Sequence, residues 1–342
     1  MQKNIDCPYC DGQVALIHQI QKLNYKKEDF DISAHFYKCN SCGEEFTTTE
    51  TDELSMTQVH NLYREGHRIP FPEEIAQVRE QYGLSAAAMS EVLGLGVNGY
   101  GLYEKGEMPT TAIGNLIASA RNPVVFKNML EGAIELIPKS AGITALQKVG
   151  DIMEIGNQPK SFINQIDRYN KPNSFTGFKT PNVEVIKTLV TSFISRCNIV
   201  FNDRLKINKL LFYCDFLAYK SSGFSISGLS YRAIQFGPVP SGYDNLFALL
   251  QNDQTIFADW QLEDKNPREL FFAQTKPNTD LLSKFENEIL DFICEKFSDT
   301  SSWHLVEMSH AEKGWIEMNK ERGMISYQEY AFKLSGVYMD SK

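Results

Sequence analysis

Four cysteines form two Cys-x-x-Cys pairs near the start of the chain. The first pair is Cys7 and Cys10, and the second pair, Cys39 and Cys42, follows after 28 intervening residues. Each pair can supply two thiolates from one tight turn, and two such turns complete the closed tetrahedral site that structural zinc prefers. A redox Cys-x-x-Cys or two disulfides are the alternatives, and each explains one pair better than two. We therefore predict one structural zinc ion per chain.

Short strands are expected to hold these cysteines, at residues 14–20 and 35–39. Strands this short and few cannot bury a core, so residues 1–50 are predicted to form a small β module whose folding depends on zinc. Three further cysteines lie in apolar helical contexts and are interpreted as buried small side chains: Cys197, Cys214 and Cys294.

Residues 75–117 read as a helix-turn-helix with a following helix. Ser85 suits a helix N-cap, Gly94 and Gly96 suit the turn, and residues 98–105 would be the recognition helix. Other helices are expected over 50–67, from Pro72, from Met108, and over 122–137. The predicted domain spans residues 51–137.

Polar side chains on the predicted recognition helix could contact DNA. Asn98 can pair with adenine in the major groove, and Tyr100 and Tyr103 can offer hydroxyls to phosphates or help to pack the helix. Basic side chains could add backbone contacts, namely Lys105, Arg64, Arg68 and Arg79. However, residues 51–135 hold six Lys or Arg against eleven Asp or Glu. The alternative is a helical bundle that serves only dimerisation or partner binding.

The whole chain has 342 residues, 42% of them apolar, which favours two or three folded domains. A net charge of −9 argues against broad, sequence-independent binding of nucleic acid. No apolar run reaches 18 residues, and the first residues lead directly into the cysteine motif. We expect a cytoplasmic protein with no membrane partner.

An apolar stripe on the helix over 122–137 is a candidate homodimer seam, although packing within one chain is equally ordinary; it comprises Val125, Met129, Ile134 and Ile137. Residues 138–181 are rich in Gly, Asn and Pro and are predicted to connect two halves of the chain, with the boundary near 166–181. Residues 182–342 form the last predicted domain.

This last domain is expected to be mainly helical, with an extended segment over 227–240 and a strand pair near 257–275. Helices are expected over 183–198, 205–219, 243–250, 281–297, 302–318 and 326–334. Groups that could suggest catalysis are Cys214, Asp215, His304 and His310. No activating charge stands beside the cysteine, and the histidines fall on different helix faces, so we predict no enzyme.

The first half resembles bacterial antitoxins of the MqsA type, which combine two Cys-x-x-Cys pairs with an XRE-like helix-turn-helix. The likeness is densest at 96–98 and at 103–106 followed by Pro109. It implies that Asn98 reads bases. An arginine common four residues later is Leu102 here, and a glutamine of the second helix is Ala86. Two polar DNA contacts of the family are therefore missing from this chain.

The second half resembles the Panacea domain, also called SocA-like or DUF4065, found in antitoxins that neutralise many unrelated toxins. The matching residues are Lys209, Tyr213, Asp215, Phe216, Gly228, Tyr231, Arg232, the run Phe236-Gly-Pro-Val-Pro240, Ser309, His310 and Trp315. The resemblance implies a mainly helical α+β domain that binds a toxin protein. Tyr231, Arg232 and Tyr243, around the Gly-Pro-Val-Pro turn, are candidate toxin-binding residues because Tyr and Arg dominate interface energies. A core position is an equally open alternative for Tyr231 and for Phe236.

Together these features predict a multidomain, mainly α protein: a zinc-bound β module, an XRE-like bundle and a Panacea-like domain. The hypothesis is a type II antitoxin that binds its cognate toxin through residues 182–342 and represses its own operon by binding operator DNA. In MqsA-type antitoxins the toxin site lies at the N-terminus, which is the other possible location. The alternative function is a zinc-containing transcriptional regulator whose C-terminal domain senses a ligand or partner.

Overall fold

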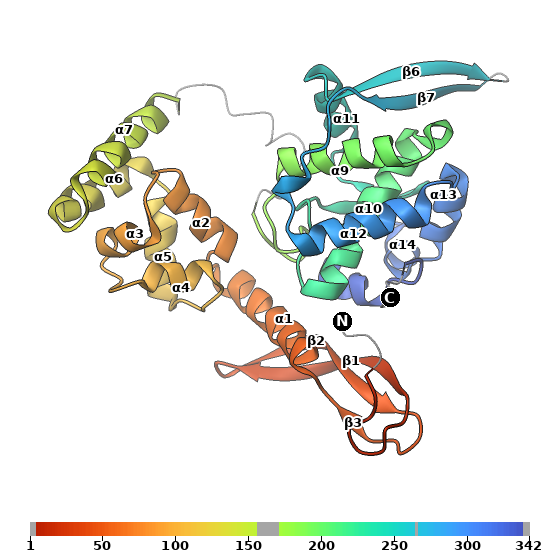
Figure 1. The fold of residues 1–342 in the computed structure, drawn as a ribbon, viewed down its shortest axis with the longest axis horizontal. Coiled ribbons are helices and arrows are strands. Elements are labelled where there is room, and N and C mark those ends of the chain that lie inside the picture. The colour runs from red at the N-terminus through yellow and green to blue at the C-terminus, as the bar shows by residue number, and fades with distance from the viewer. Residues whose placement is uncertain (1–4, 156–170, 264–265, 338–342) are drawn as a thin grey trace. The chain divides into compact units, whose positions relative to one another are not determined.

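The computed structural model describes residues 5–155, 171–263 and 266–337 (Figure 1). Helices predominate, and the strands form small antiparallel sheets. The expected fold class, multidomain and mainly α with a small β module, is confirmed.

Contacts group the chain into two compact units, one of residues 1–59 and 163–342 and the other of residues 60–162. The cysteine module therefore clusters with the C-terminal residues, and the helix-turn-helix residues interrupt that unit in sequence. Helix α1 (Thr49–His67) begins in the first unit and ends in the second.

The cysteine module is a long hairpin with a short third strand. Strands β1 (Val14–Tyr25), β2 (Glu28–Cys39) and β3 (Glu45–Phe46) pair antiparallel in that order. The strands are longer than predicted because Lys26 and Lys27, both at positive φ, close a tight two-residue turn. The open end of the hairpin pairs Val14 with Cys39, so the second cysteine pair starts where β2 stops.

The second unit is a bundle of short helices. Its elements are α2 (Pro72–Glu80), α3 (Ala86–Val92), α4 (Gly99–Glu104), α5 (Thr111–Ala120), α6 (Pro123–Ala133), η1 (Ile134–Leu136) and α7 (Lys139–Ile155). The predicted caps are present: the Ser85 hydroxyl accepts the N–H of Ala88, and the Thr110 hydroxyl accepts that of Ile113. These local signals explain why the helix starts were predictable.

One apolar core closes this bundle. The rings of Tyr82 and Phe126 stack with centroids 3.7 Å apart. Helix α7 adds Ala145 and Val149 to the same core, so residues 139–155, expected as part of a connecting segment, belong to the folded bundle. Ile137 of the predicted dimer seam is also buried in this core. Residues 156–170 of the expected connection lie outside the described residues.

The C-terminal residues form helices around a small sheet. The elements are α9 (Val183–Arg196), η2 (Ile199–Phe201), α10 (Arg204–Ser222), β4 (Tyr231–Ile234), β5 (Gly237–Pro240), α11 (Tyr243–Asn252), β6 (Ile256–Glu263), β7 (Asn266–Ala273), η3 (Thr279–Leu281), α12 (Lys284–Phe297), α13 (Ser302–His310), α14 (Lys313–Met318), β8 (Met324–Ile325), α15 (Tyr327–Tyr330) and η4 (Ala331–Lys333). The three-stranded sheet has the order β5-β4-β8, and β6 pairs with β7.

Helix α10 is the centre of this domain. All residues from 206 to 219 are buried, and α9 and α12 pack beside it (Figure 1). The helix predicted over 302–318 is instead broken at Glu312. Its carboxylate accepts the backbone N–H groups of Ser335 at 2.9 Å and Gly336 at 2.7 Å. The break therefore depends on a loop more than twenty residues later in the chain.

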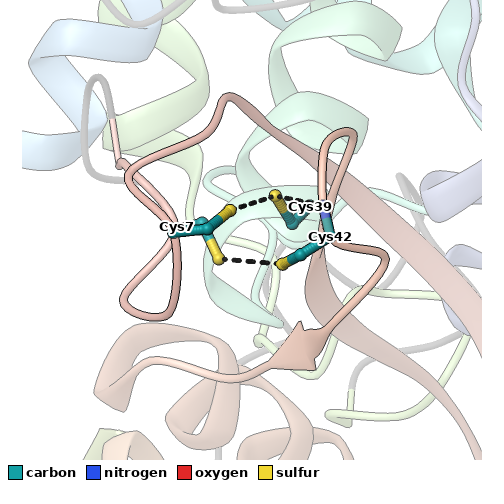
Figure 2. A group of neighbouring side chains, drawn as sticks. Cys7, Cys39 and Cys42 are labelled. Atoms are coloured by element: carbon teal, nitrogen blue, oxygen red, sulfur yellow. Dashed lines mark hydrogen bonds between the residues drawn. The ribbon is translucent and has the colours of Figure 1, made fainter.

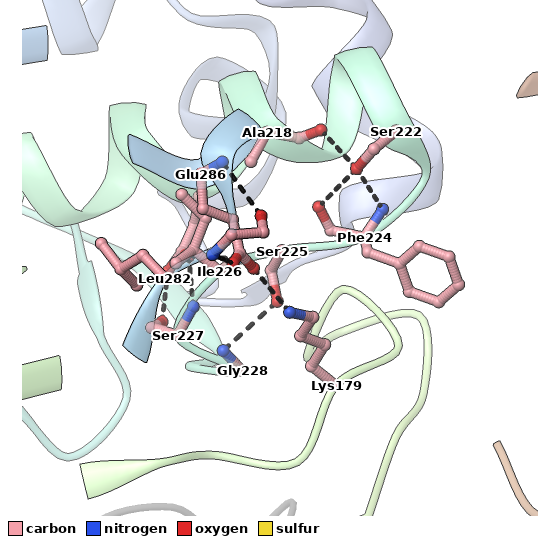
Figure 3. A network of polar contacts seen from close by, with 12 residues as sticks. Lys179, Ala218, Ser222, Phe224, Ser225, Ile226, Ser227, Gly228, Leu282 and Glu286 are labelled. Atoms are coloured by element: carbon pink, nitrogen blue, oxygen red, sulfur yellow. Dashed lines mark hydrogen bonds and ion pairs between the residues drawn. The ribbon is translucent and has the colours of Figure 1, made fainter. Parts of the chain in front are cut away.

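Residues 171–181 also pack on this domain. Thr176 and Phe178 are buried, and Lys179 forms an ion pair with Glu286 of α12 at 2.7 Å (Figure 3). The Ser225 hydroxyl donates to the carbonyl of Thr176 at 2.7 Å. The end of the expected connecting segment is thus part of the folded domain.

Candidate functional site

The four cysteines lie together at the open end of the hairpin. Their Sγ atoms all fall within 4.8 Å of one another. Cys7 Sγ is 3.6 Å from Cys42 Sγ, and Cys10 Sγ is 3.5 Å from Cys39 Sγ. Figure 2 shows Cys7, Cys39 and Cys42 pointing toward one another from two loops.

This geometry fits zinc. Four sulfurs placed tetrahedrally at ~2.3 Å from zinc lie about 3.8 Å apart, whereas a disulfide needs ~2.05 Å. All seven cysteines are free thiols. Backbone N–H groups of Cys42 and Ser41 point at Cys39 Sγ and lower the pKa of its thiol to about 6. Cys39 is therefore the readily ionised member of the cluster, whereas hydrogen bonding and burial within the cluster raise the pKa values of the Cys10 and Cys42 thiols, which a bound metal ion would have to deprotonate.

The start of helix α4 places Asn98 on the surface of the bundle. This residue is exposed and has a left-handed backbone, with φ of 59°. Lys105 is exposed and Tyr103 half-buried. Tyr100 is fully buried, and its hydroxyl donates to the carbonyl of Ile75 at 2.6 Å. Tyr100 therefore packs the helix, which is the second of its two expected roles, and its hydroxyl is not available to a phosphate.

The basic candidates differ in availability. Arg64 is buried and donates to the carbonyls of Gly106 and Glu107 at 3.2 and 3.0 Å, which fixes the loop after α4. Arg79 is paired with Glu104 and donates to the carbonyl of Leu84. Of the four basic candidates, Lys105 and Arg68 remain exposed.

Several residues that carry the Panacea resemblance support the hairpin β4–β5. The Lys209 ammonium donates to the carbonyl of Pro238 at 3.0 Å, and burial lowers the pKa of Lys209 to about 7. The indole N–H of Trp315 donates to the carbonyl of Ile234 at 2.7 Å, and the His310 ring stacks on Trp315 at 3.8 Å. The motif is thus largely a structural scaffold.

A buried carboxylate organises the loop before β4. Asp215 of α10 accepts the backbone N–H groups of Ile226 and Ser227, the Ser227 hydroxyl, and the hydroxyl of Tyr231 at 2.8 Å. Burial raises the pKa of this carboxyl. Of the three candidate interface residues, Tyr231 is fully buried and thus lies in the core, which was one of its two expected positions, whereas Arg232 is exposed and Tyr243 is half-buried.

Phe236, on the turn between β4 and β5, forms an exposed aromatic pair with Trp303 of α13, a residue that the sequence analysis did not select. Phe236 is 40% exposed and Trp303 of α13 is 61% exposed. Their ring centroids are 6.0 Å apart at 82°. The sequence signal for an exposed Trp303 was its position among polar residues, in the run Ser301-Ser302-Trp303-His304.

The groups considered for catalysis do not share a site. Cys214 is fully buried, and burial raises the pKa of its thiol well above the usual value. His304 lies on the surface, with its Nδ1 3.7 Å from a carboxylate oxygen of Glu307. A buried thiol and an exposed imidazole cannot act on one substrate.

Comparison with known families gives two matches. Residues 5–123 match the model of MqsA, the antitoxin component of a bacterial toxin-antitoxin system. Residues 207–316 match the model of the antitoxin SocA-like Panacea domain. Searches among curated proteins and solved structures give no match. Among the described residues, no helix is long and apolar enough to cross a membrane.

Both matches are to antitoxin families, and they coincide with the two halves on which the resemblances rest. The four-cysteine cluster and the helix-turn-helix lie within the first match, and the β4–β5 hairpin lies within the second. The chain therefore joins an N-terminal region of the MqsA antitoxin type to a C-terminal domain of the SocA-like Panacea type.

Proposed function

We propose that this chain is the antitoxin of a type II toxin-antitoxin system that has divided its tasks between its halves. Residues 182–342 bind and neutralise a toxin protein without catalysis. The helix-turn-helix, as a homodimer, represses the chain's own operon, and the four cysteines hold one structural zinc ion. The observation that carries the toxin assignment is the exposed pair Phe236–Trp303 on the domain that matches a SocA-like antitoxin.

The DNA proposal rests on the surface of α4. Asn98 is flanked by exposed apolar side chains, with Val97 86% and Leu102 47% exposed. An amide can read adenine, and an apolar side chain can contact a thymine methyl. With Lys105 and Arg68 as the exposed members of the four basic candidates, few phosphates are neutralised, so binding should be modest and moderately sensitive to salt.

Asn98→Ala is expected to weaken operator binding by roughly 1–3 kcal/mol and to relax specificity at one position of each half-site. Lys105→Ala should weaken binding to all sequences alike and reduce the salt slope by about 1. The measurement is a titration of the protein's own promoter fragment at several salt concentrations. Asn128→Ala, an exposed asparagine on α6, is the control and should bind as the parent does. Equal binding by the Asn98 variant and the parent would leave α4 without a role in DNA reading.

The toxin proposal rests on how the aromatic pair is presented. The Lys209–Pro238 and Trp315–Ile234 hydrogen bonds fix both strands beneath the β4–β5 turn. Large aromatics held in place by a rigid scaffold lose little conformational entropy on binding, and they are the residue types that dominate interface energies. Arg232 lies on the exposed side of the neighbouring strand and can add a polar contact at the rim.

Trp303→Ala is expected to weaken toxin binding by about 2 kcal/mol or more, roughly thirtyfold, and to abolish rescue of cells that express the adjacent toxic gene. Phe236→Ala should act in the same direction. The readouts are growth rescue by the full chain and a direct affinity measurement with purified toxin.

Trp260→Ala is the matched control, because Trp260 is 60% exposed but lies on the β6–β7 hairpin. It should keep full rescue. Loss of rescue with Trp260→Ala but not with Trp303→Ala would move the toxin site to the other hairpin. Retained rescue by all three variants would mean that the toxin-binding site lies outside this domain, with the cysteine module as the next candidate.

A further inference from the structure

The hairpin β1–β2 buries its middle against C-terminal residues of the same compact unit. On β2, Ser33 is 2% and His35 is 3% exposed. The His35 ring meets the ring of Phe332 in η4 edge to face, with centroids 5.2 Å apart. Burial lowers the pKa of His35 to about 4, so its imidazole is neutral in this contact at neutral pH.

A side-chain amide links the two parts. Gln58 of α1 is fully buried. Its Nε2 donates to the Ser33 carbonyl at 2.9 Å, and its Oε1 accepts the Ser33 N–H at 2.9 Å and Nε2 of Gln328 at 3.0 Å. Oε1 of Gln328 in turn accepts the Tyr219 hydroxyl at 2.6 Å. The hydrogen bonds therefore run without a break from β2 to α15 and α10.

The segment that receives this link supports the β4–β5 hairpin. Next to Gln328, Tyr327 is fully buried, and its hydroxyl donates to the carbonyl of Leu229 at 2.8 Å. Its ring stacks on Phe216 with centroids 4.2 Å apart. Just before it, β8 pairs directly with β4. Residues 324–334 thus lie between the cysteine module and the strand that leads to Phe236.

We propose that the metal held by the four cysteines regulates the C-terminal domain through this link. A two-stranded ribbon is marginally stable by itself, so closure of its open end at the cysteines determines whether Ser33 stays in place. If the metal leaves, the hairpin end frays, the Ser33–Gln58 hydrogen bonds open, and residues 324–334 lose their support. Metal-loaded protein holds the toxin-binding hairpin rigid, and metal-free protein does not. This inference rests on the proposed metal site, but not on toxin or operator binding.

Hydrogen exchange measured by mass spectrometry on the full chain tests the link. Stripping the metal with a chelator is expected to speed exchange in residues 324–334 about tenfold, equivalent to ~1.4 kcal/mol, while α12 keeps its protection. Gln58→Leu should produce the same acceleration while elemental analysis still finds one zinc per chain. Gln19→Leu makes the same chemical change at an exposed position of β1 and should alter neither quantity.

Unchanged exchange in residues 324–334 after complete removal of the metal would overturn the proposal. So would unchanged exchange in the Gln58→Leu protein. A chain that purifies without metal would refute the metal site itself, and the link with it. None of these outcomes depends on the toxin or the operator, so failure here is distinct from failure of the antitoxin assignment.

Discussion

Cys39→Ser is expected to abolish stable metal binding and to unfold the loops at the open end of the hairpin. Cys39 is 3% exposed, and its Sγ accepts two backbone N–H groups at 3.3 and 3.5 Å. A serine hydroxyl is a harder and far less acidic ligand than a thiol, so the fourth position of the site is lost. Structural zinc contributes about 10–16 kcal/mol to the folding of small zinc modules, which makes this the largest effect expected in the chain.

Elemental analysis should fall from one zinc per chain in the parent to well below that in the variant. Amides in residues 7–13 and 39–46 should lose their protection from hydrogen exchange. Cys197→Ala is the control, because Cys197 is buried in the C-terminal domain and lies outside the cluster. Full metal content in the Cys39 variant would show that the cluster does not bind zinc through four thiolates.

Gly228→Ala is expected to destabilise the C-terminal domain strongly. Gly228 has a φ of 75°, and an added Cβ would lie 2.6 Å from the carbonyl carbon and oxygen of Thr180 and 2.7 Å from the nitrogen of Pro181. These are backbone atoms, so they cannot rotate away. The left-handed alanine costs about 1–2 kcal/mol, and the overlap costs a further 1–3 kcal/mol. The sum is a large part of the ~5–15 kcal/mol by which a domain is stable.

Denaturant unfolding followed by tryptophan fluorescence measures this effect. The three tryptophans of the chain, Trp260, Trp303 and Trp315, all lie in the C-terminal domain. Gly132→Ala is the control, because Gly132 lies in helix α6 with open space around its Cα. It should leave the tryptophan transition unchanged. A Gly228 variant with the parent's midpoint would mean that residues 180–181 move aside at little cost.

The features that were predicted correctly from the sequence depend on short-range chemistry. Four thiols at metal-ligand spacing indicate one cluster whatever surrounds them, and their Sγ atoms do meet. Helix starts depend on neighbouring residues, such as Ser85 with Ala88, so they too were predictable. The two-residue turn at Lys26 and Lys27 was missed because lysine is not a residue type that signals positive φ.

The features that were missed depend on tertiary packing. A tyrosine suits a protein core and an interface equally well, and only the fold shows that Tyr100 donates to Ile75 and Tyr231 to Asp215. Exposed Phe236 and Trp303 are distant in sequence and become a pair only in space. Nothing in the sequence indicated that Gln58 is buried, since a glutamine in a helix usually faces water.

The hairpin β1–β2 is synthesised long before the C-terminal residues against which it packs. The ring of His35 packs on that of Phe332, almost three hundred residues later. At ribosomal rates of about 5–20 residues per second, the cysteine module waits roughly 15–60 s for that partner to be made. During this interval, metal closes the open end of the hairpin, and Gln58 of α1 can already bond to Ser33. The C-terminal domain reaches its final packing only after residues 327–336 have been made, so a nascent chain that lacks them is not yet a competent antitoxin under this proposal.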